Sequence, residues 1–227
     1  MHIIEIKALL FMLIPIGIVW FFYYRWTKNY KEVGLATFRM VLQLLIIGYL
    51  LVYIFNNKDV FIGFFVLLFM ISVSSFIALR NVKRRDLKTY FNFFISILIG
   101  GGFNLILSLY FVLDLHPLYQ PKYIIPLAGM VFANAMNSLS LSAERFEREI
   151  EENGYEKARA LSFKASLIPQ INAFLAVGLV SLPGMMTGQI LSGVDPVIAV
   201  RYQIMVMAMV LGSAGMSSAI YLSLQRN

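Results

Sequence analysis

The sequence predicts an all-α protein, a polytopic bundle of seven transmembrane helices, and three observations support this prediction. Apolar residues make up 59% of the 227 residues and charged residues only 14%, whereas about a quarter of the residues in a soluble domain are charged. The mean hydropathy is +0.76, so polar surface is too scarce to cover a water-soluble globule. Seven apolar stretches approach the roughly 20 residues that a helix needs to cross the hydrocarbon core. We therefore expect a lipid bilayer to surround most of the chain.

The predicted spans are separated by polar stretches. The first span lacks the basic start and the small-residue cleavage site of a signal peptide, so we expect it to be retained as a helix. The first two spans are short, and the sixth is interrupted by Pro183 and Gly184. By residue number the spans are 8–24, 40–55, 60–79, 91–113, 123–143, 171–191 and 202–224.

Lysine and arginine gather on one side of these spans. The segments 25–39, 80–88 and 145–164, together with the C-terminal tail, hold 15 of the 19 basic residues. The positive-inside rule places these segments in the cytoplasm. The N-terminus is then outside and the C-terminus cytoplasmic, in a multi-pass protein of the inner (plasma) membrane. Because the basic residues cluster by loop, the net charge of +7 reflects topology, and we expect no nucleic-acid partner.

We expect residues 1–227 to form a single transmembrane domain. Its longest polar segment, residues 144–168, follows the fifth span. Asn153 and Gly154 interrupt a helical pattern that resumes at Tyr155. We expect a helix to leave the membrane, turn at Gly154 and run back. Mixed charge on such a helix is typical of a solvated hairpin, but it also suits a docking element for a cytoplasmic partner.

The sequence offers no catalytic site. It has no G-x-x-x-x-G-K-[ST] loop to cradle ATP phosphates and no H-E-x-x-H zinc motif. No span holds paired carboxylates, and Asp114 and Asp195, near the outer ends of spans, are weak candidates for metal ligands. We therefore expect no cofactor in this chain, and the energy for any active transport must come from a partner.

The fifth predicted span carries polar residues at helical spacing. Asn134 follows Met130 by four residues, Asn137 follows Ala133 in the same way, and Met136 precedes Asn137. An amide in hydrocarbon needs a partner, so these faces point to another helix or to a water-lined path. Packing between helices and a route for substrate both explain the pattern.

The sixth predicted span contains a helix breaker. Pro183 removes a backbone hydrogen bond, and a broken helix at membrane depth is tolerated only inside protein or beside a cavity. Gly184 and Gly188 form a step of small residues that lets another backbone approach closely. Met185 and Met186 supply polarizable thioethers, which serve either packing or a path for a soft cation.

The same segment resembles a known family. Residues 181–188 read Ser-Leu-Pro-Gly-Met-Met-Thr-Gly, which resembles the SLPGMM-x-G signature of the FetB-type iron-export permeases, a family related to plant aluminium-tolerance permeases. The match continues through residues 193–196 and 201–204. Residues 125–130 and 134–136 resemble the family's P-x-A-G-M and N-A-M blocks. The resemblance extends over most of the chain.

The resemblance implies a function. Members of this family are ABC-transporter permeases that pair with a separate ATP-binding subunit. This chain would then be the membrane-spanning permease subunit of an ATP-driven exporter of iron or another metal cation. Two copies would assemble with two cytoplasmic ATPase subunits, which would bind the ATP and Mg. Residues 144–168 would be the coupling loop, with Glu149, Glu151, Gly154 and Tyr155 as its partner-coupling residues.

Under this interpretation the substrate path is lined by polar, small and thioether residues of the fifth and sixth spans: Met130, Asn134, Met136, Asn137, Pro183, Gly184, Met185, Met186 and Gly188. An ATP-independent secondary transporter is an alternative, but it would normally need an ionisable residue at the bilayer midplane, which no span offers. An intramembrane lipid-modifying enzyme is a weaker alternative, because the sequence lacks an acid, base or metal constellation.

Overall fold

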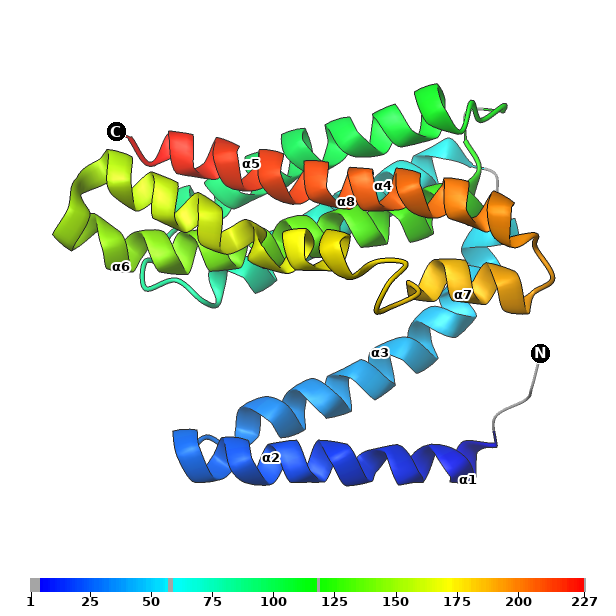
Figure 1. Ribbon diagram of the computed structural model, residues 1–227, viewed down its shortest axis with the longest axis horizontal. Coiled ribbons are helices and arrows are strands. Elements are labelled where there is room, and N and C mark those ends of the chain that lie inside the picture. Colours follow the sequence, from blue (N-terminus) through cyan, green and yellow to red (C-terminus); the bar gives the residue numbers. More distant parts are fainter. Residues whose placement is uncertain (1–4, 57–58, 118, 227) are drawn as a thin grey trace. The chain divides into compact units, whose positions relative to one another are not determined.

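The computed structural model describes residues 5–56, 59–117 and 119–226, and every regular element in those ranges is a helix. Figure 1 shows their arrangement. In chain order the elements are α1 (Ile6–Leu9), η1 (Leu10–Met12), α2 (Leu13–Thr27), α3 (Lys31–Asn56), α4 (Val60–Leu79), α5 (Leu87–Ile106), η2 (Leu107–Val112), α6 (Pro121–Ala176), α7 (Gly184–Leu191) and α8 (Pro196–Leu224). The predicted all-α class is confirmed.

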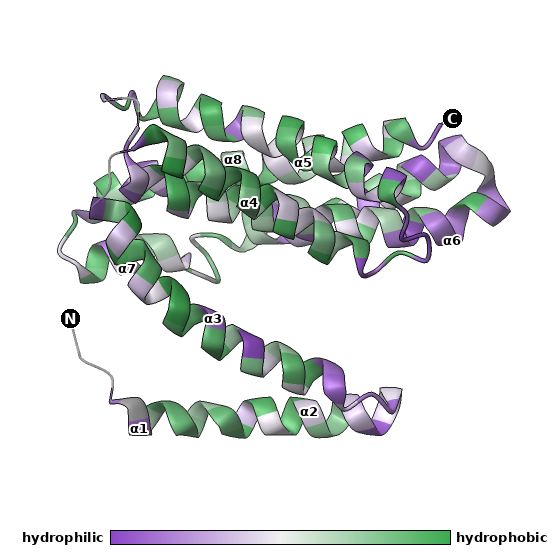
Figure 2. Ribbon diagram, turned by 180° about the vertical axis from the view of Figure 1, so that it is seen from behind, coloured by the Kyte–Doolittle hydropathy of each residue, from purple (hydrophilic) through white to green (hydrophobic). Residues whose placement is uncertain are grey.

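Six helical segments of the described residues are long and apolar enough to cross a membrane. The first two, Lys7–Thr27 and Lys31–Asn56, are longer than the predicted spans 8–24 and 40–55, because polar residues at their ends continue the helix. Figure 2 shows hydrophobic residues along the middle of α4, α5 and α8 and hydrophilic residues around the bend of α6. The predicted multi-pass membrane architecture is confirmed.

The chain divides into two compact units, residues 1–57 and 58–227. The first unit contains a hairpin of α2 and α3, which turns where Lys28 adopts a left-handed conformation with φ 58°. The indole Nε1 of Trp20 donates a hydrogen bond of 2.7 Å to the carbonyl of Tyr30. A Cβ on Gly34 would stand 3.7 Å from the Trp20 ring, so the two helices pack closely there.

The second unit is a bundle of α4, α5, α6 and α8, with α7 packed against α8. Its core is filled by large apolar side chains, and Phe93, Ile97, Leu139 and Leu222 are at most 1% exposed. Small residues bring helices into close contact around this core. A Cβ on Gly100 of α5 would stand only 2.6 Å from a backbone nitrogen of α8, so no larger residue fits at that position.

Buried serine hydroxyls join both parts of α6 to α8. The Oγ of Ser138 donates to the carbonyl of Ser166 at 3.1 Å and lies 2.9 Å from the Oγ of Ser218. All three serines are fully buried. Inside a bilayer no hydrophobic force drives helices together, so hydrogen bonds of this kind help to hold them in contact.

The long helix α6 is bent at Gly154, where φ is 68° and ψ is 170°. This region of backbone space is accessible almost only to glycine, so the side-chain-free residue sets the position of the bend. The predicted turn at Gly154 is confirmed. In Figures 1 and 2 the bend lies at the same end of the bundle as the C-terminus of α8.

The predicted sixth span is discontinuous. α6 ends at Ala176, α7 begins at Gly184, and the intervening backbone is not helical. The interruption is longer than Pro183 and Gly184 alone would require, because Gly178 turns the chain with φ 80°. The carbonyl of Ala176 then accepts hydrogen bonds from the amides of the turn, among them that of Val180 at 2.8 Å.

Candidate functional site

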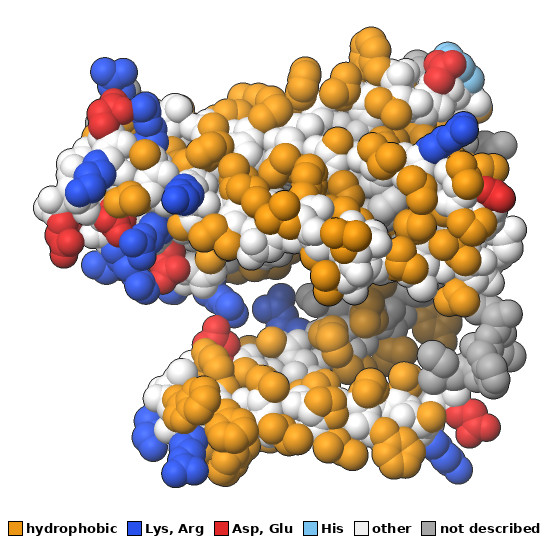
Figure 3. All heavy atoms as spheres, viewed as in Figure 1, with side chains coloured by type: hydrophobic (Ala, Val, Ile, Leu, Met, Phe, Trp, Pro, Cys, Tyr) orange, Lys and Arg blue, Asp and Glu red, His pale blue; other side chains and the backbone are white. Residues whose placement is uncertain are grey.

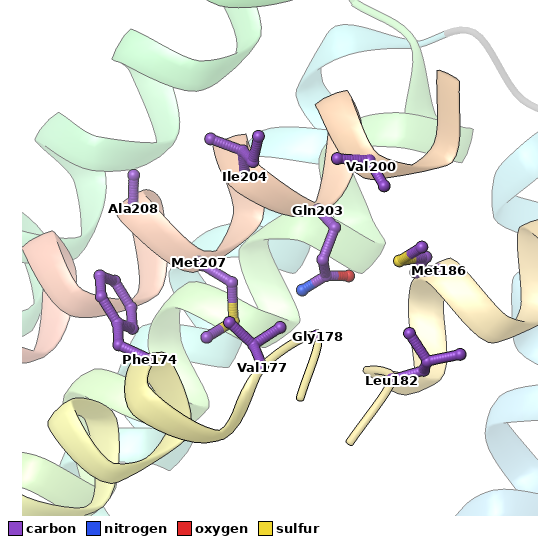
Figure 4. Close-up of a pocket in the computed structure, with 10 residues that line it drawn as sticks. All are labelled: Phe174, Val177, Gly178, Leu182, Met186, Val200, Gln203, Ile204, Met207 and Ala208. Atoms are coloured by element: carbon purple, nitrogen blue, oxygen red, sulfur yellow. The ribbon is translucent and has the colours of Figure 1, made fainter. Parts of the chain in front are cut away.

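The interruption between α6 and α7 opens onto two adjoining cavities. Residues of α6, α7 and α8 line both, and the volumes are about 400 Å³ and 330 Å³. The larger cavity, shown in Figure 4, is lined by Phe174, Val177, Gly178, Leu182, Met186, Val200, Gln203, Ile204, Met207 and Ala208. The smaller one is lined by Met130, Asn134, Pro169, Gln170, Ala173, Phe174, Pro183, Gly184, Met185, Gln203, Val206, Met207 and Val210.

Gln203 of α8 lies between the two cavities and lines both. Its side chain extends into the space bordered by Val177, Gly178 and Met186 (Figure 4). The residue is only 5% exposed, and its Oε1 accepts no hydrogen bond from any described residue. A buried acceptor without a partner costs about 1–3 kcal/mol, so a donor or a cation that reached this oxygen would stabilise it.

Gln170 presents a second oxygen of the same kind. It lines the smaller cavity from the last turns of α6, is 7% exposed, and its Oε1 is likewise without a partner among the described residues. Neither glutamine is among the residues predicted from the sequence, although the reasoning applied to Asn134, an amide within an apolar span, applies equally to them. The two glutamines are the most deeply buried polar side chains of the cavities.

The structure brings together five of the predicted path residues. Met130, Asn134, Pro183, Gly184 and Met185 all line the smaller cavity. The Nδ2 of Asn134 donates to the carbonyl of Met130 at 2.8 Å, so one end of this amide is satisfied within its own helix. The fifth and sixth predicted spans therefore meet at one cavity.

Other predicted path residues lie elsewhere. Met186 lines the larger cavity only. Asn137 is exposed on the bundle surface, and Met136 packs against the hydrophobic core. A Cβ added to Gly184 or Gly188 would meet no atom of another described segment within 4 Å, so the face of α7 that these glycines mark stands open.

The two predicted metal candidates have structural partners. Asp195 caps α8, since its Oδ1 accepts from the amide of Val197 at 2.8 Å. Asp114 lies 3.1 Å from the Nε2 of His116. Within the described ranges no group of three or more acidic or histidine side chains could hold a metal ion. A metal site that used Asp114 or Asp195 would need further ligands.

The hairpin at the bend of α6 is ordered by its own side chains. Glu149 pairs with Arg145 at 2.5 Å and accepts from Asn153 at 2.7 Å, so both its oxygens are used inside the hairpin. Tyr155 packs edge-on against Phe146 with ring centroids 6.1 Å apart. Glu151, by contrast, is exposed. Figure 3 shows acidic and basic side chains gathered at this end of the bundle.

A neighbouring loop is fixed to the same end. The carboxylate of Glu147 on α6 accepts from the backbone amides of Lys83 at 2.8 Å and Arg84 at 3.3 Å. These two residues belong to the basic connection between α4 and α5. Glu147 is not among the residues predicted from the sequence, because a glutamate in a charged run gives no sign of a partner 64 residues away.

Comparison with known proteins gives one family. The model of the uncharacterised protein family UPF0014 matches residues 5–163 and 152–227. A UPF0014 membrane protein of Synechocystis, slr1647, is 33% identical over 189 residues, which cover 76% of this chain and 73% of the relative. The "Probable iron export permease protein FetB" of Escherichia coli is 35% identical over 209 residues, covering 84% and 78%. The "Protein ALUMINUM SENSITIVE 3" of Arabidopsis thaliana is 34% identical over 198 residues, covering 79% and 70%. No solved structure matches the chain.

Proposed function

The chain belongs to the UPF0014 family of membrane proteins, and we propose on this basis that it is the membrane-spanning permease subunit of an ATP-driven exporter of iron or another metal cation. One relative is named for iron export and another for aluminium sensitivity, and both names support a metal cargo. The observation that carries the transport role is the pair of cavities at the interrupted span. Secondary transporters build their substrate sites at discontinuous helices, so the interruption supports transport without deciding what drives it.

The energy source in this proposal is a separate cytoplasmic subunit that binds ATP and Mg. The chain has no phosphate-binding loop of its own. The hairpin at the bend of α6 is the proposed docking element, because it is ordered internally by Glu149 and Tyr155 and leaves Glu151 exposed for a partner. By the positive-inside rule, the hairpin end of the bundle faces the cytoplasm at the inner membrane in this proposal, and the N-terminus lies outside.

A second copy of the chain is the proposed neighbour at the interruption. Leu179 and Val180, in the non-helical segment, are 88% and 84% exposed in the single chain. Non-helical backbone facing lipid is not tolerated at membrane depth, so protein or water has to cover this segment. The open face at Gly184 and Gly188 of α7 would let a helix of the second copy approach closely.

An ATP-independent secondary transporter is the second candidate, and the interrupted helix favours it, since such transporters use broken helices. Against it, the cavity-lining residues among those described include no ionisable side chain. A proton-coupled transporter would normally place one there. The two candidates differ in what drives the cargo, so one experiment separates them.

The experiment uses everted membrane vesicles that contain this chain with or without an ABC-type ATP-binding subunit from the same organism. We expect Fe²⁺ uptake into the vesicles only when both subunits and ATP are present. A non-hydrolysable nucleotide should abolish uptake. Fe²⁺ movement by the chain alone under an imposed pH gradient would instead establish the secondary transporter.

A further inference from the structure

Two buried side-chain oxygens at the two cavities have no partner among the described residues. The Oε1 atoms of Gln170 and Gln203 are buried and accept no hydrogen bond from the described residues. Both side chains are more than nine-tenths buried and line the same smaller cavity. An acceptor is satisfied by a hydrogen-bond donor or by a cation, so a cation that reached these two oxygens would supply a partner that the described residues do not.

Two backbone carbonyls just beyond the end of α6 are also without a hydrogen-bond donor among the described residues. The carbonyls of Val177 and Gly178 receive no hydrogen bond from the described backbone or side chains, and both residues line the larger cavity beside Gln203. The C-terminus of a helix also carries the negative end of its macrodipole. Unwound carbonyls and helix C-termini are the groups that coordinate cations in broken-helix transporters.

Thioether sulfurs complete the lining. Met130 and Met185 line the smaller cavity, Met186 the larger, and Met207 both. Thioethers are soft ligands that favour later transition metals over Mg²⁺ or Ca²⁺. The absence of charged ligands from the described lining limits affinity, which suits a cargo that has to be released.

We infer that Gln203 and Gln170 are ligands of a transition-metal cation that has lost part of its hydration shell, bound between α8 and the unwound end of α6. The inference rests on the proposed function for the identity of the cargo. The amide and carbonyl oxygens replace the water of the ion, and the methionine sulfurs select a soft or borderline metal. Gln203 is the central ligand because it faces both cavities.

The test is direct binding of Fe²⁺ to the purified full-length chain under anaerobic conditions, without ATP or a partner. We expect one site per chain and at least about tenfold weaker binding of Mg²⁺. Gln203→Leu and Gln170→Leu should each weaken Fe²⁺ binding by about tenfold or more, since loss even of outer-shell partners costs 10–100-fold. Gln225→Leu, the same change on the same chain just beyond α8 and outside both cavities, is the matched control.

Two further measurements keep the test decisive. The melting temperature of the Leu variants should stay level or rise, because each removes an unpaired buried acceptor. Gln203→Glu keeps an oxygen ligand and adds charge, so it should bind Fe²⁺ at least as tightly as the parent chain. Unchanged Fe²⁺ binding in Gln203→Leu, loss of binding in Gln203→Glu, or binding of inorganic phosphate in place of Fe²⁺ would each overturn the site. None of these outcomes depends on ATP, so failure of ATP-driven transport is a separate result.

Discussion

The hydroxyl of Tyr155 donates a hydrogen bond of 2.9 Å to the backbone carbonyl of Leu222, near the C-terminal end of α8. Tyr155 directly follows the bend of α6, and α8 carries Gln203 and Met207 to the cavities. One helix therefore connects the proposed docking hairpin to the proposed cation site. We expect a displacement of the hairpin to be transmitted to the cavity in part through this contact with α8.

Tyr155→Phe tests this connection, since it keeps the aromatic ring on Phe146 and removes only the hydroxyl. We expect a loss of about 1 kcal/mol in the free energy of unfolding, together with ATPase activity that no longer drives Fe²⁺ uptake in full. Tyr53→Phe, on an exposed position of α3, is the control. If both variants take up the same amount of Fe²⁺ per ATP hydrolysed, the hydrogen bond only stabilises the fold.

Gly154→Ala should weaken the bend. The backbone of Gly154 lies in a region almost restricted to glycine, and another residue there costs about 1–3 kcal/mol. We expect the variant to insert into the membrane normally but to co-purify poorly with the ATP-binding subunit. Gly48→Ala, in the middle of α3 with open space around it, should have no such effect. Normal co-purification of Gly154→Ala would argue against the hairpin as the docking element.

Glu151 and Glu149 should behave differently on charge reversal. Glu149→Lys breaks the pair with Arg145 and the hydrogen bond from Asn153, so it should lower the thermal stability of the chain. Glu151→Lys disturbs no partner among the described residues, and its effect should appear only as weaker binding of the ATP-binding subunit. Affinity measured by surface plasmon resonance, set beside melting temperature, separates the two. If the Glu151→Lys chain binds the ATP-binding subunit normally, that subunit contacts another part of the hairpin.

Asn134 and Asn137 form a matched pair on α6. Asn134 lines the smaller cavity, whereas Asn137 lies outside both cavities on the surface. We expect Asn134→Leu to reduce metal efflux from loaded cells several-fold at unchanged protein level, and Asn137→Leu to reduce it less. Equal effects of the two substitutions would move the path to the surface between two copies.

The chain has no cysteine, so single cysteines can report water access. A cysteine at Asn134 or Met185 should react with a water-soluble thiol reagent in at least one nucleotide state, because both positions line the smaller cavity. A cysteine at the fully buried Leu139 should stay unreactive. Failure of both cavity positions to react in every state would mean that they serve packing.

Features that depend only on the local sequence were predictable. Long apolar runs indicated the membrane segments, Gly154 the bend, and Pro183 the interruption, because each acts on its own stretch of backbone. The unwound stretch before Pro183 was underestimated, since it depends on the turn at Gly178. Local signals of this kind do not depend on which helices become neighbours.

Features that depend on neighbouring helices were not predictable. Phe93 is fully buried while Phe91 is 51% exposed, yet both are phenylalanines of one predicted span, because lipid and core accept the same side chains. The contact of Ser138 with Ser218 and the burial of Gln203 arise only when α6 meets α8. Which of the amides within the spans line the candidate site was therefore visible only in the folded bundle.

The short helix α7 is attached by non-helical backbone at both ends, with glycines of positive φ in each connection, Gly178 at 80° and Gly193 at 91°. Such connections act as hinges, because torsions there can change without breaking the hydrogen bonds inside a helix. We therefore expect any movement of α7 to be a tilt about these two connections that leaves the packing of α6 on α8 intact. A tilt of this kind would change access to the proposed cation site, and its cost would be the loss of contacts between α7 and α8.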